Sequence, residues 1–476
     1  MMQSAFSQAT PSHEADGVQA DRHESAAPHA HPTAAGDRDS LTLAFLPWGN
    51  VIEDFLDTIG VSLESFCNEF TGSYIFRYVE ALKKAGVRTV LICVSVRVVK
   101  ISQFTHRPTG ATIYLVPALK VYKTVRSKML NPYGHTVKDA FGKIRGARWL
   151  LFPALSILKE VVLFLTTPLK PLYGILQSEQ CSAILCQEYE YPRFDVCVLL
   201  GWLNQLPVFA TFQGGDYQRS RLERFVRPVT LRACEGLIIA SQSEVRRVQA
   251  RYGISTVNVA RIFNPIDLHL WQGIPRDEAR APLGIPPHAG VVAWHGRISI
   301  WKKGLDILLE AWEQVCSQRP DRDLRLILVG TGQDAEKFSQ RLAALGKTKI
   351  LWLNEFLHDP LIIKRYLSAA NVYAFPSRHE GFPVAPLEAM GCGLPIAAAE
   401  VQGIPDILAG GELSGGIIVP RESATELASA VGRLLDDEPW SRELGMRARQ
   451  RVENYFSLEA VGHQLRDFLF SGRPAN

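Results

Sequence analysis

Short apolar runs alternate with amphipathic stretches along most of the chain. The runs that we interpret as strands are LTLAFLP, RTVLICV, ATIYLV, AILCQ, PVFATF and GLIIA in the first half, and VVAWHGR, LRLILVG, KILWL, NVYAF, PIAAA and GIIVP in the second. Near-continuous apolar strands separated by helices are typical of parallel sheets that are covered on both faces. The pattern predicts an α/β fold with two doubly wound, Rossmann-like domains that face each other across a cleft.

Helix signals and a break between the two series give the domain limits. Residues 73–85 place Ile75, Phe76, Val79 and Leu82 on one face and end at Gly86. Ser241 and Glu244 form a capping box that opens another helix. An Asn-Pro break at 264–265 separates the series, so we expect domains over 41–265 and 266–455. The amphipathic helix 456–470 is expected to pack back on the first domain.

Composition excludes several classes of protein. The chain has 476 residues and a net charge of +4, which is too balanced for a dedicated nucleic-acid binder. Residues 1–40 lack an apolar run, so we expect a disordered tail and no secretory signal. The eight cysteines are scattered, as in a reduced cytosolic protein. Cys181, Cys186 and Cys197 are a zinc alternative, although no CxxC pair supports it.

A basic and apolar insertion, 120–175, stands out within the first half. Its residues 120–148 carry eight basic side chains against one acid, Asp139, and the run WLLFPALSILKEVVLFLTTPL follows. Pro153 and the Lys159–Glu160 pair interrupt this run, so no transmembrane helix is expected. Two interpretations stay open. The insertion lies in the interface of an anionic membrane, or it is a helical insertion that faces the core and has a solvated basic face.

Two glutamates in HEGFPVAPLEAMGCGLPIAA suggest chemistry. The preceding run NVYAF is a strand and Pro386 suits a first helical position, so Glu380 falls in a loop and Glu388 in the first helical turn. The loop and the helix N-terminus offer free backbone N–H groups to an anion, and the carboxylates accept hydrogen bonds from hydroxyls. A diphosphate together with hydroxyls describes a nucleotide sugar.

Two further motifs precede this one on the same predicted sheet. Arg297 and Lys303 flank a strand–helix turn, where a cationic pair would clamp a diphosphate. Gly330 and Gly332 form a Gly-x-Gly loop after the next strand. Taken singly, each motif has a plain explanation: a solvated turn, a tight turn, or a glutamate that only complements a helix dipole. Their order, with all three at the carboxyl edge of one sheet, favours a shared site.

With these motifs the chain resembles the retaining glycosyltransferases of GT-B fold, group 1 (family 4), over roughly residues 41–470. The resemblance implies that Arg297 and Lys303 hold the donor diphosphate and that Glu380 lies near the donor sugar, so these three are the expected catalytic residues. It places Glu388 on the ribose and the other donor-binding residues at Gly296, Gly330, Gly332, Gly381, Phe382 and Pro383. Asn264 and Asp267 fall in the family's interdomain Asn-x-x-Asp signature.

The first half departs from the family pattern. A Gly-rich loop often follows the first strand, but here LPWGN leads into an acidic insertion and Gly72 comes only before the helix. Many members have His-Gly after a middle strand, where this chain has Gln213 in TFQGGDY. Glutamine cannot shuttle a proton, so an acid–base role at this position is in doubt. The expected acceptor and cleft residues are Gly72, Gln213, Asp216 and Asn264, and a simple polar turn is the alternative for Gln213 and Asp216.

The resemblance implies retaining transfer of a hexose from a UDP-, GDP- or ADP-sugar to a glycan or lipid-linked acceptor, without a metal ion or other cofactor. Bacterial surface polysaccharide or glycolipid assembly is the expected setting, in the cytoplasm or peripherally at the inner face of an anionic membrane, with no nucleic-acid partner. One alternative is a two-domain sugar-binding receptor, which would need export. Another is a different GT-B enzyme, such as an epimerase or a phosphorylase, and the latter would need a pyridoxal-binding lysine.

Overall fold

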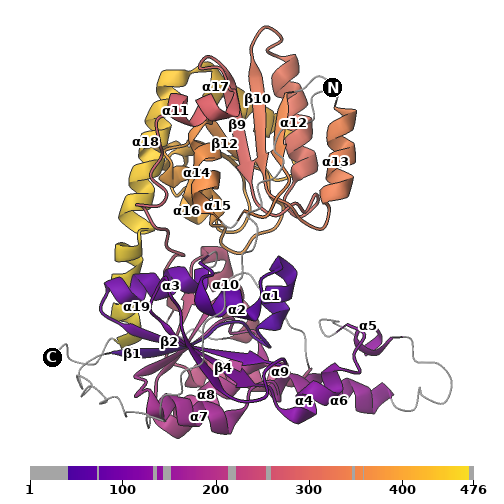
Figure 1. Cartoon of the computed structure of the whole chain (residues 1–476), viewed down its shortest axis with the longest axis vertical. Helices are drawn as coiled ribbons and strands as arrows, with labels where there is room; N and C mark the ends of the chain where they lie inside the picture. The colour runs from indigo at the N-terminus through magenta and orange to yellow at the C-terminus, as the bar shows by residue number, and fades with distance from the viewer. Residues whose placement is uncertain are drawn as a thin grey trace, which may run out of the picture. The chain divides into compact units, whose positions relative to one another are not determined.

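The computed structural model contains two sheets that are each wrapped by helices (Figure 1). It describes residues 41–71, 74–131, 137–142, 152–212, 221–253, 259–345, 349–357 and 359–470. Both sheets are dominated by parallel strands with buried faces, as the apolar runs predict. The α/β fold class with two doubly wound halves is therefore confirmed.

The first sheet has eight strands in the order β3-β4-β2-β1-β5-β6-β7-β8. They are β1 (Thr42–Leu46), β2 (Arg88–Ser95), β3 (Ser102–Thr105), β4 (Thr112–Pro117), β5 (Ala183–Cys186), β6 (Val208–Phe212), β7 (Gly236–Ile239) and β8 (Val259–Ala260). All neighbours are parallel except β3, which runs antiparallel to β4 at one edge. This strand was not among the predicted ones, and its SQFT sequence alternates between half-buried and exposed residues as an edge strand does.

The second sheet has six parallel strands in the order β11-β10-β9-β12-β13-β14. They are β9 (Gly290–His295), β10 (Leu324–Val329), β11 (Ile350–Leu353), β12 (Val372–Phe375), β13 (Ile396–Ala399) and β14 (Gly416–Val419). Strand β9 lies in the middle and pairs with β10 and β12. All six correspond to apolar runs in the sequence.

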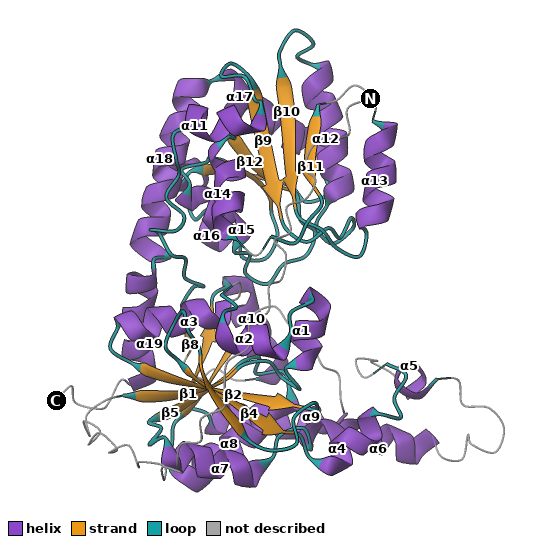
Figure 2. Cartoon of the chain, viewed as in Figure 1, coloured by secondary structure: helices purple, strands orange, loops and turns teal. Residues whose placement is uncertain are grey.

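Helices cover both faces of each sheet (Figure 2). In the first half they are α1 (Glu53–Ile59), α2 (Leu63–Asn68), α3 (Tyr74–Lys84), α4 (Lys120–Arg126), α5 (Val137–Phe141), α6 (Phe152–Phe164), α7 (Leu169–Ser178), α8 (Pro192–Asn204), α9 (Arg221–Ala233) and α10 (Gln242–Tyr252). In the second half they are α11 (Arg276–Arg280), α12 (Leu305–Ser317), α13 (Ala335–Ala344), α14 (Pro360–Ser368), α15 (Ala385–Gly391), α16 (Ile404–Ile407), α17 (Ala424–Asp436), α18 (Glu438–Tyr455) and α19 (Leu458–Phe470), with 3₁₀ turns at Ala281–Leu283 and Gly411–Ser414.

The acidic insertion after the first strand forms helices α1 and α2. Two of its acids are buried because they have partners. Glu53 accepts hydrogen bonds from Ser95 and from the backbone N–H of Val96, and Asp54 pairs with Arg126 of α4 at 2.6 Å. The insertion is therefore tied to β2 and α4 through its charges, which a buried carboxylate requires.

The last helix packs on the first domain, although it follows the second domain in the chain. Helix α19 lies against α3, where Lys84 pairs with Glu459 at 2.7 Å and Arg466 donates to the carbonyl of Ala85 at 3.2 Å. Its Val461 and Leu465 are fully buried in the core of the first domain. Where the chain returns, the segment after α18 pairs with the connection between the domains, through Ile266 and Ser457.

None of the described helices has the length and apolar character needed to cross a bilayer. Cys181, Cys186 and Cys197 are buried in the first domain, and the described residues contain no group of ligands that could hold a metal ion. The described part of the chain therefore does not support the zinc alternative.

Candidate functional site

Strand β9 leads into a loop that carries the two predicted cations. His295 is the last residue of β9, and Gly296, Arg297 and Lys303 follow before α12 begins at Leu305. The side chain of Arg297 is exposed and makes no hydrogen bond or ion pair with the described residues. Lys303 is half-buried and pairs with Glu380 at 2.6 Å. One cation at this edge is thus open to solvent, and the other is anchored.

The loops after β9 and β10 pack directly on each other. Gly296 and Gly330 both have a positive φ, of 149° and 130°. A Cβ on Gly330 would clash with the carbonyl oxygen of Gly296, and one on Gly332 would clash with that of Ile298. The backbone N–H of Ile298 donates to the carbonyl of Thr331 at 3.0 Å. Glycine is required here because two backbones approach closely and adopt a conformation that other residues rarely take.

The loop after β12 brings Glu380 to the same edge. The backbone N–H of Arg378 donates to the carbonyl of Lys302 at 3.0 Å, which ties this loop to the loop after β9. The Arg378 guanidinium pairs with Asp306 in the first turn of α12 at 2.8 Å. Glu380 then meets Lys303 from the loop that follows the neighbouring parallel strand. The structure therefore brings Arg297, Lys303 and Glu380 together around adjoining loops.

Glu388 lies in the first turn of α15 and is nearly buried. Its two carboxylate oxygens have different partners: Nε2 of His295 at 2.8 Å and Nη2 of Arg77 at 2.5 Å. Burial works against the charged form, but Arg77 and His295 outweigh it, so the pKa of Glu388 lies below its usual range. Glu388 is consequently a carboxylate at neutral pH, and its position is fixed from two sides.

Two buried nitrogen atoms on the partners of Glu388 have no hydrogen-bond partner among the described residues. Nη1 of Arg77 and Nδ1 of His295 are buried and make no hydrogen bond within the part of the chain that the structure describes. Buried nitrogens of this kind normally have a partner. They lie on the two residues that position Glu388, so they mark this place as one that suits a polar ligand.

Three predicted donor residues follow Glu380 directly. Gly381 continues the loop, Phe382 is buried and stacks on Phe263 with ring centroids 5.3 Å apart, and Pro383 is buried beside Gly403. The Phe382 side chain belongs to the apolar core of the second domain, and Pro383 is buried. Only the backbone of this segment is therefore available to a ligand, as expected for its N–H groups.

The predicted residues of the first domain are mostly outside the described part of the chain. Gly72, Gln213 and Asp216 lie there, so the structure does not place them. Asn264 is described and buried in the segment that connects the two domains, close to Ile266. The acceptor side of the site stays a prediction.

Sequence reasoning missed Arg77 and His295. His295 had a signal, because it directly precedes Gly296 at the end of an apolar strand, where ligand-contacting side chains are common. Arg77 had none, because it lies on the polar face of α3 and is 311 positions from Glu388. It reaches the site only through the packing of the two domains.

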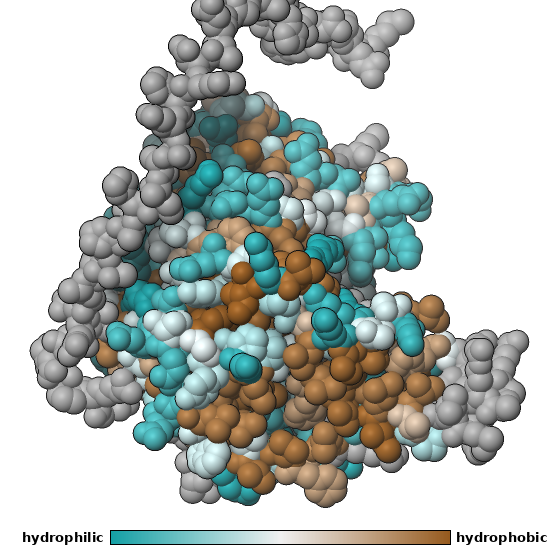
Figure 3. All heavy atoms as spheres, turned by 60° about the horizontal axis from the view of Figure 1, so that its bottom comes forward, coloured by the Kyte–Doolittle hydropathy of each residue, from teal (hydrophilic) through white to brown (hydrophobic). Residues whose placement is uncertain are grey.

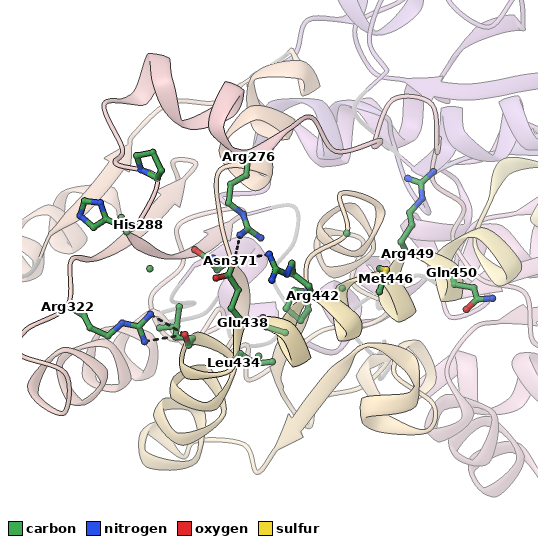
Figure 4. Close-up of a pocket in the computed structure, with 18 of the residues that line it drawn as sticks. Arg276, His288, Arg322, Asn371, Leu434, Glu438, Arg442, Met446, Arg449 and Gln450 are labelled. Carbon is green, nitrogen blue, oxygen red and sulfur yellow. Dashed lines mark hydrogen bonds and ion pairs between the residues drawn. The ribbon is translucent and has the colours of Figure 1, made fainter.

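A separate cavity of about 620 Å³ lies at the opposite edge of the second sheet, near the starts of β9, β12 and β13. Four arginines contribute to its wall. Figure 4 shows Arg276 and Arg442 both reaching Glu438. These two ion pairs have N–O distances of 3.4 Å each. Arg449 and Glu453 form a further pair at 2.6 Å. None of the predicted site residues lines this cavity, so it is distinct from the loops at the carboxyl edge.

Part of the chain is similar in sequence to known glycosyltransferases. Residues 289–437 match the family model for Glycosyl transferases group 1. The chain is 32% identical over 238 residues to the D-inositol 3-phosphate glycosyltransferase of Corynebacterium aurimucosum, covering 48% of this chain and 55% of that protein. It is 29% identical over 269 residues to the alpha-maltose-1-phosphate synthase of Mycolicibacterium smegmatis, covering 53% and 66%. The chain thus matches between half and two thirds of these relatives' length.

Solved structures show the same architecture over nearly the whole chain. Sucrose-phosphate synthase from Thermosynechococcus elongatus superposes with a TM-score of 0.61 at 20% identity, covering 91% of this chain and all of that one. Anabaena HepE in complex with UDP superposes with a TM-score of 0.61 at 16% identity. The match covers 90% of this chain and 100% of HepE. At these identities the likeness shows the fold alone.

Proposed function

The chain has the fold of the group 1 glycosyltransferases, and from this premise we propose that it is a retaining glycosyltransferase of family 4. It transfers a hexose from a nucleoside diphosphate sugar to a hydroxyl of a glycan or lipid-linked acceptor. Arg297, Lys303 and Glu380 are the proposed catalytic residues, and Glu388 is the proposed ribose ligand. The setting is surface polysaccharide or glycolipid synthesis in the cytoplasm, at or near the inner face of a membrane.

One observation carries the proposal. Two cations from the loop after β9 and two carboxylates, one from the loop after β12 and one from α15, gather at the carboxyl edge of the second sheet, where the two loops are tied by backbone hydrogen bonds. Open α/β sheets bind ligands at this edge. The cations suit a diphosphate, and the carboxylates suit sugar hydroxyls. An epimerase or a phosphorylase would share the fold, but no particular observation favours either.

The difficult step is departure of the diphosphate while positive charge grows on the sugar. Arg297 has no competing partner among the described residues, and Lys303 is held in place by Glu380. Lys303 is thus held in place before the reaction and stabilises the developing negative charge without reorganising, while Arg297 is available to bind the diphosphate. In this proposal they take the role that a metal ion has in other transferases, and an oxygen of the leaving diphosphate takes the proton of the acceptor.

The other end of the donor is recognised by Glu388. Arg77 and His295 keep it charged and oriented, so both its oxygens point in fixed directions to accept hydrogen bonds from the ribose. This recognition does not distinguish UDP, GDP and ADP, because all three carry the same ribose. The bound UDP of the Anabaena neighbour supports testing UDP-sugars first.

The test is turnover of labelled UDP-, GDP- and ADP-sugars, with and without lipid and glycan extracts as acceptors. We expect Arg297→Ala and Lys303→Ala each to lower kcat by about 10²–10³-fold, the loss typical of one preorganised donor to a developing anion. Lys302→Ala is the matched control, because its side chain is exposed and only its carbonyl takes part in the loop contacts. The anomeric configuration of the product, read by NMR, tests retention.

Unchanged turnover in both Arg297→Ala and Lys303→Ala would overturn the proposal. Nucleotide release that needs added pyridoxal phosphate would favour a phosphorylase, and release without transfer to any acceptor would favour an epimerase-like enzyme. Binding of sugars with no turnover of any nucleotide sugar would favour a binding protein.

A further inference from the structure

One end of the first domain exposes an unusual number of large apolar side chains. They lie on helices α4, α6, α7, α8 and α9. Trp202 and Phe225 are the most exposed of them, at 76% and 77%. We call this set the apolar face, and its members are Val121, Ile157, Val161, Leu169, Tyr173, Leu199, Trp202, Leu203, Phe225 and Val229. Large contiguous apolar areas are rare on soluble monomers and mark sites of interaction.

These helices are neighbours, so the exposed residues form one surface. Helix α8 contacts α6, α7 and α9, and α6 contacts α4. Figure 3 brings this end of the molecule forward and shows a broad, nearly continuous hydrophobic area over it. The surface extends beyond the 120–175 insertion that the sequence singles out, because α8 and α9 supply the two most exposed aromatic residues.

The spacing shows that the exposed residues form ordered stripes. On α6, α7 and α9 they are four positions apart, at 157 and 161, 169 and 173, and 225 and 229, so each helix presents one outward stripe. On α8 the inward residues Phe194, Cys197 and Leu200 are buried in the core. The inward residues thus pack in the core of the first domain. The outward stripes are left exposed on the described part of the chain.

The exposed charges on these helices are nearly all basic. On the described residues of α4 to α9 the exposed ionisable side chains are basic, namely Lys120, Lys138, Lys170, Arg224 and Arg232, with the single exception of Asp139. Acids on the same helices are turned inward, such as Asp195, which pairs with Arg227 at 3.0 Å. A partner for this surface must accept apolar side chains and also offer negative charge.

An anionic lipid surface meets both conditions. A second copy of the chain does not, because a two-fold dimer through this face would set lysines and arginines against their own equivalents. A bilayer takes apolar side chains to the depth of the headgroups, where tryptophan is favoured, and attracts basic residues to anionic lipid. We propose that the apolar face docks on an anionic bilayer, with Trp202 and Phe225 as its inserted side chains.

Docking has a consequence for the substrate, and this part rests on the proposed function. A transferase held by its first domain at a membrane meets acceptors that reside in that membrane. The geometry therefore favours a lipid-linked acceptor over a free glycan. The docking itself does not depend on catalysis, so it is tested without any nucleotide sugar.

The test is co-sedimentation of the full chain with vesicles of 30% phosphatidylglycerol in phosphatidylcholine, and with phosphatidylcholine alone. We expect binding to the anionic vesicles, much weaker binding to the neutral ones, and a loss on raising salt, because charges at a surface are screened. Trp202→Ser with Phe225→Ser should weaken binding by about tenfold or more, since two aromatic side chains leave the bilayer. Both positions are exposed, so the fold should persist.

Leu413→Ser with Met446→Ser is the matched control, because these residues are 77% and 67% exposed but lie in the second domain. This control variant should bind as the parent chain does. Equal binding of the parent to both vesicles, absence of binding, or full binding by the Trp202/Phe225 variant would overturn the proposal. A dimer in size-exclusion chromatography that the Trp202/Phe225 variant dissolves would assign the face to a second copy instead. UDP binding in the same preparations reports on the proposed function separately.

Discussion

At the scale of single residues, the environment decides what each ionisable group does. Glu380 and Glu388 are eight positions apart, yet one meets a lysine of its own domain and the other an arginine of the other domain. The sequence predicts both as ligand-binding carboxylates from their place around a strand and a helix start. It does not predict the partners that hold them, because those depend on packing between distant segments.

His106 gives a prediction of pH dependence. It is fully buried against the ring of Phe76, with ring centroids 3.9 Å apart, and burial lowers its pKa to about 4 despite its hydrogen bond to the carbonyl of Phe70. The unfolded chain therefore takes up the proton first as pH falls from 6.5 toward 4, so stability is lost over this window. Between pH 7.5 and pH 5 we expect a loss of about 2 kcal/mol from this group.

Denaturant unfolding at the two pH values measures this loss. His106→Gln should be less stable than the parent at pH 7.5, because glutamine does not reproduce the buried contacts of the histidine ring. It should, however, lose less stability than the parent when the pH is lowered to 5. His288 is exposed, so His288→Gln should lose as much stability as the parent when the pH is lowered. An identical pH slope in His106→Gln and the parent would refute the assignment.

At the scale of elements, the central strands were predictable and the edges were not. Strands such as β9 and β12 are buried on both faces, so their apolar runs are continuous and easily recognised. Strand β3 is polar on one side, and β8 has only two residues, so neither has a sequence pattern that differs from a loop. Helices α1 and α2 were not predicted. Two acids of α1, Glu53 and Asp54, are buried only because of partners that lie far away in the chain.

The glycine pair between the loops after β9 and β10 carries a prediction at this scale. Gly330→Ala places a Cβ against the carbonyl oxygen of Gly296 in a backbone conformation that alanine rarely adopts. We expect a loss of about 2–3 kcal/mol in the free energy of unfolding, together with weaker nucleotide binding, because the adjoining loops must separate.

Gly174→Ala is the control for this substitution. Gly174 lies inside α7, and a Cβ there meets no atom within 4 Å. Alanine should be neutral or stabilising by about 0.5–1 kcal/mol. If Gly330→Ala unfolds at the same denaturant concentration as the parent, the close approach of the two loops is wrong.

At the scale of the whole molecule, α19 joins the end of the chain to the first domain. Leu465 is fully buried in the core that also contains Leu43 of β1 and Leu82 of α3. Leu465→Ala should lower the free energy of unfolding by about 2–5 kcal/mol, the usual range for a buried leucine. Chemical denaturation measures this value, and Gln464→Ala on the exposed side of the same helix should leave it almost unchanged. Equal stability of the two variants would contradict the packing of α19.

The position of α19 also bears on how a newly made chain matures. Proteins leave the ribosome from the N-terminus, and domains usually fold as they emerge. Here the first sheet and its helices are synthesised long before residues 458–470, which supply part of their interior. The nascent first half must wait, with that apolar surface uncovered, while the second half is translated and folds. A stop codon or frameshift shortly before residue 458 would therefore leave the first domain, although it is synthesised first, without part of its core.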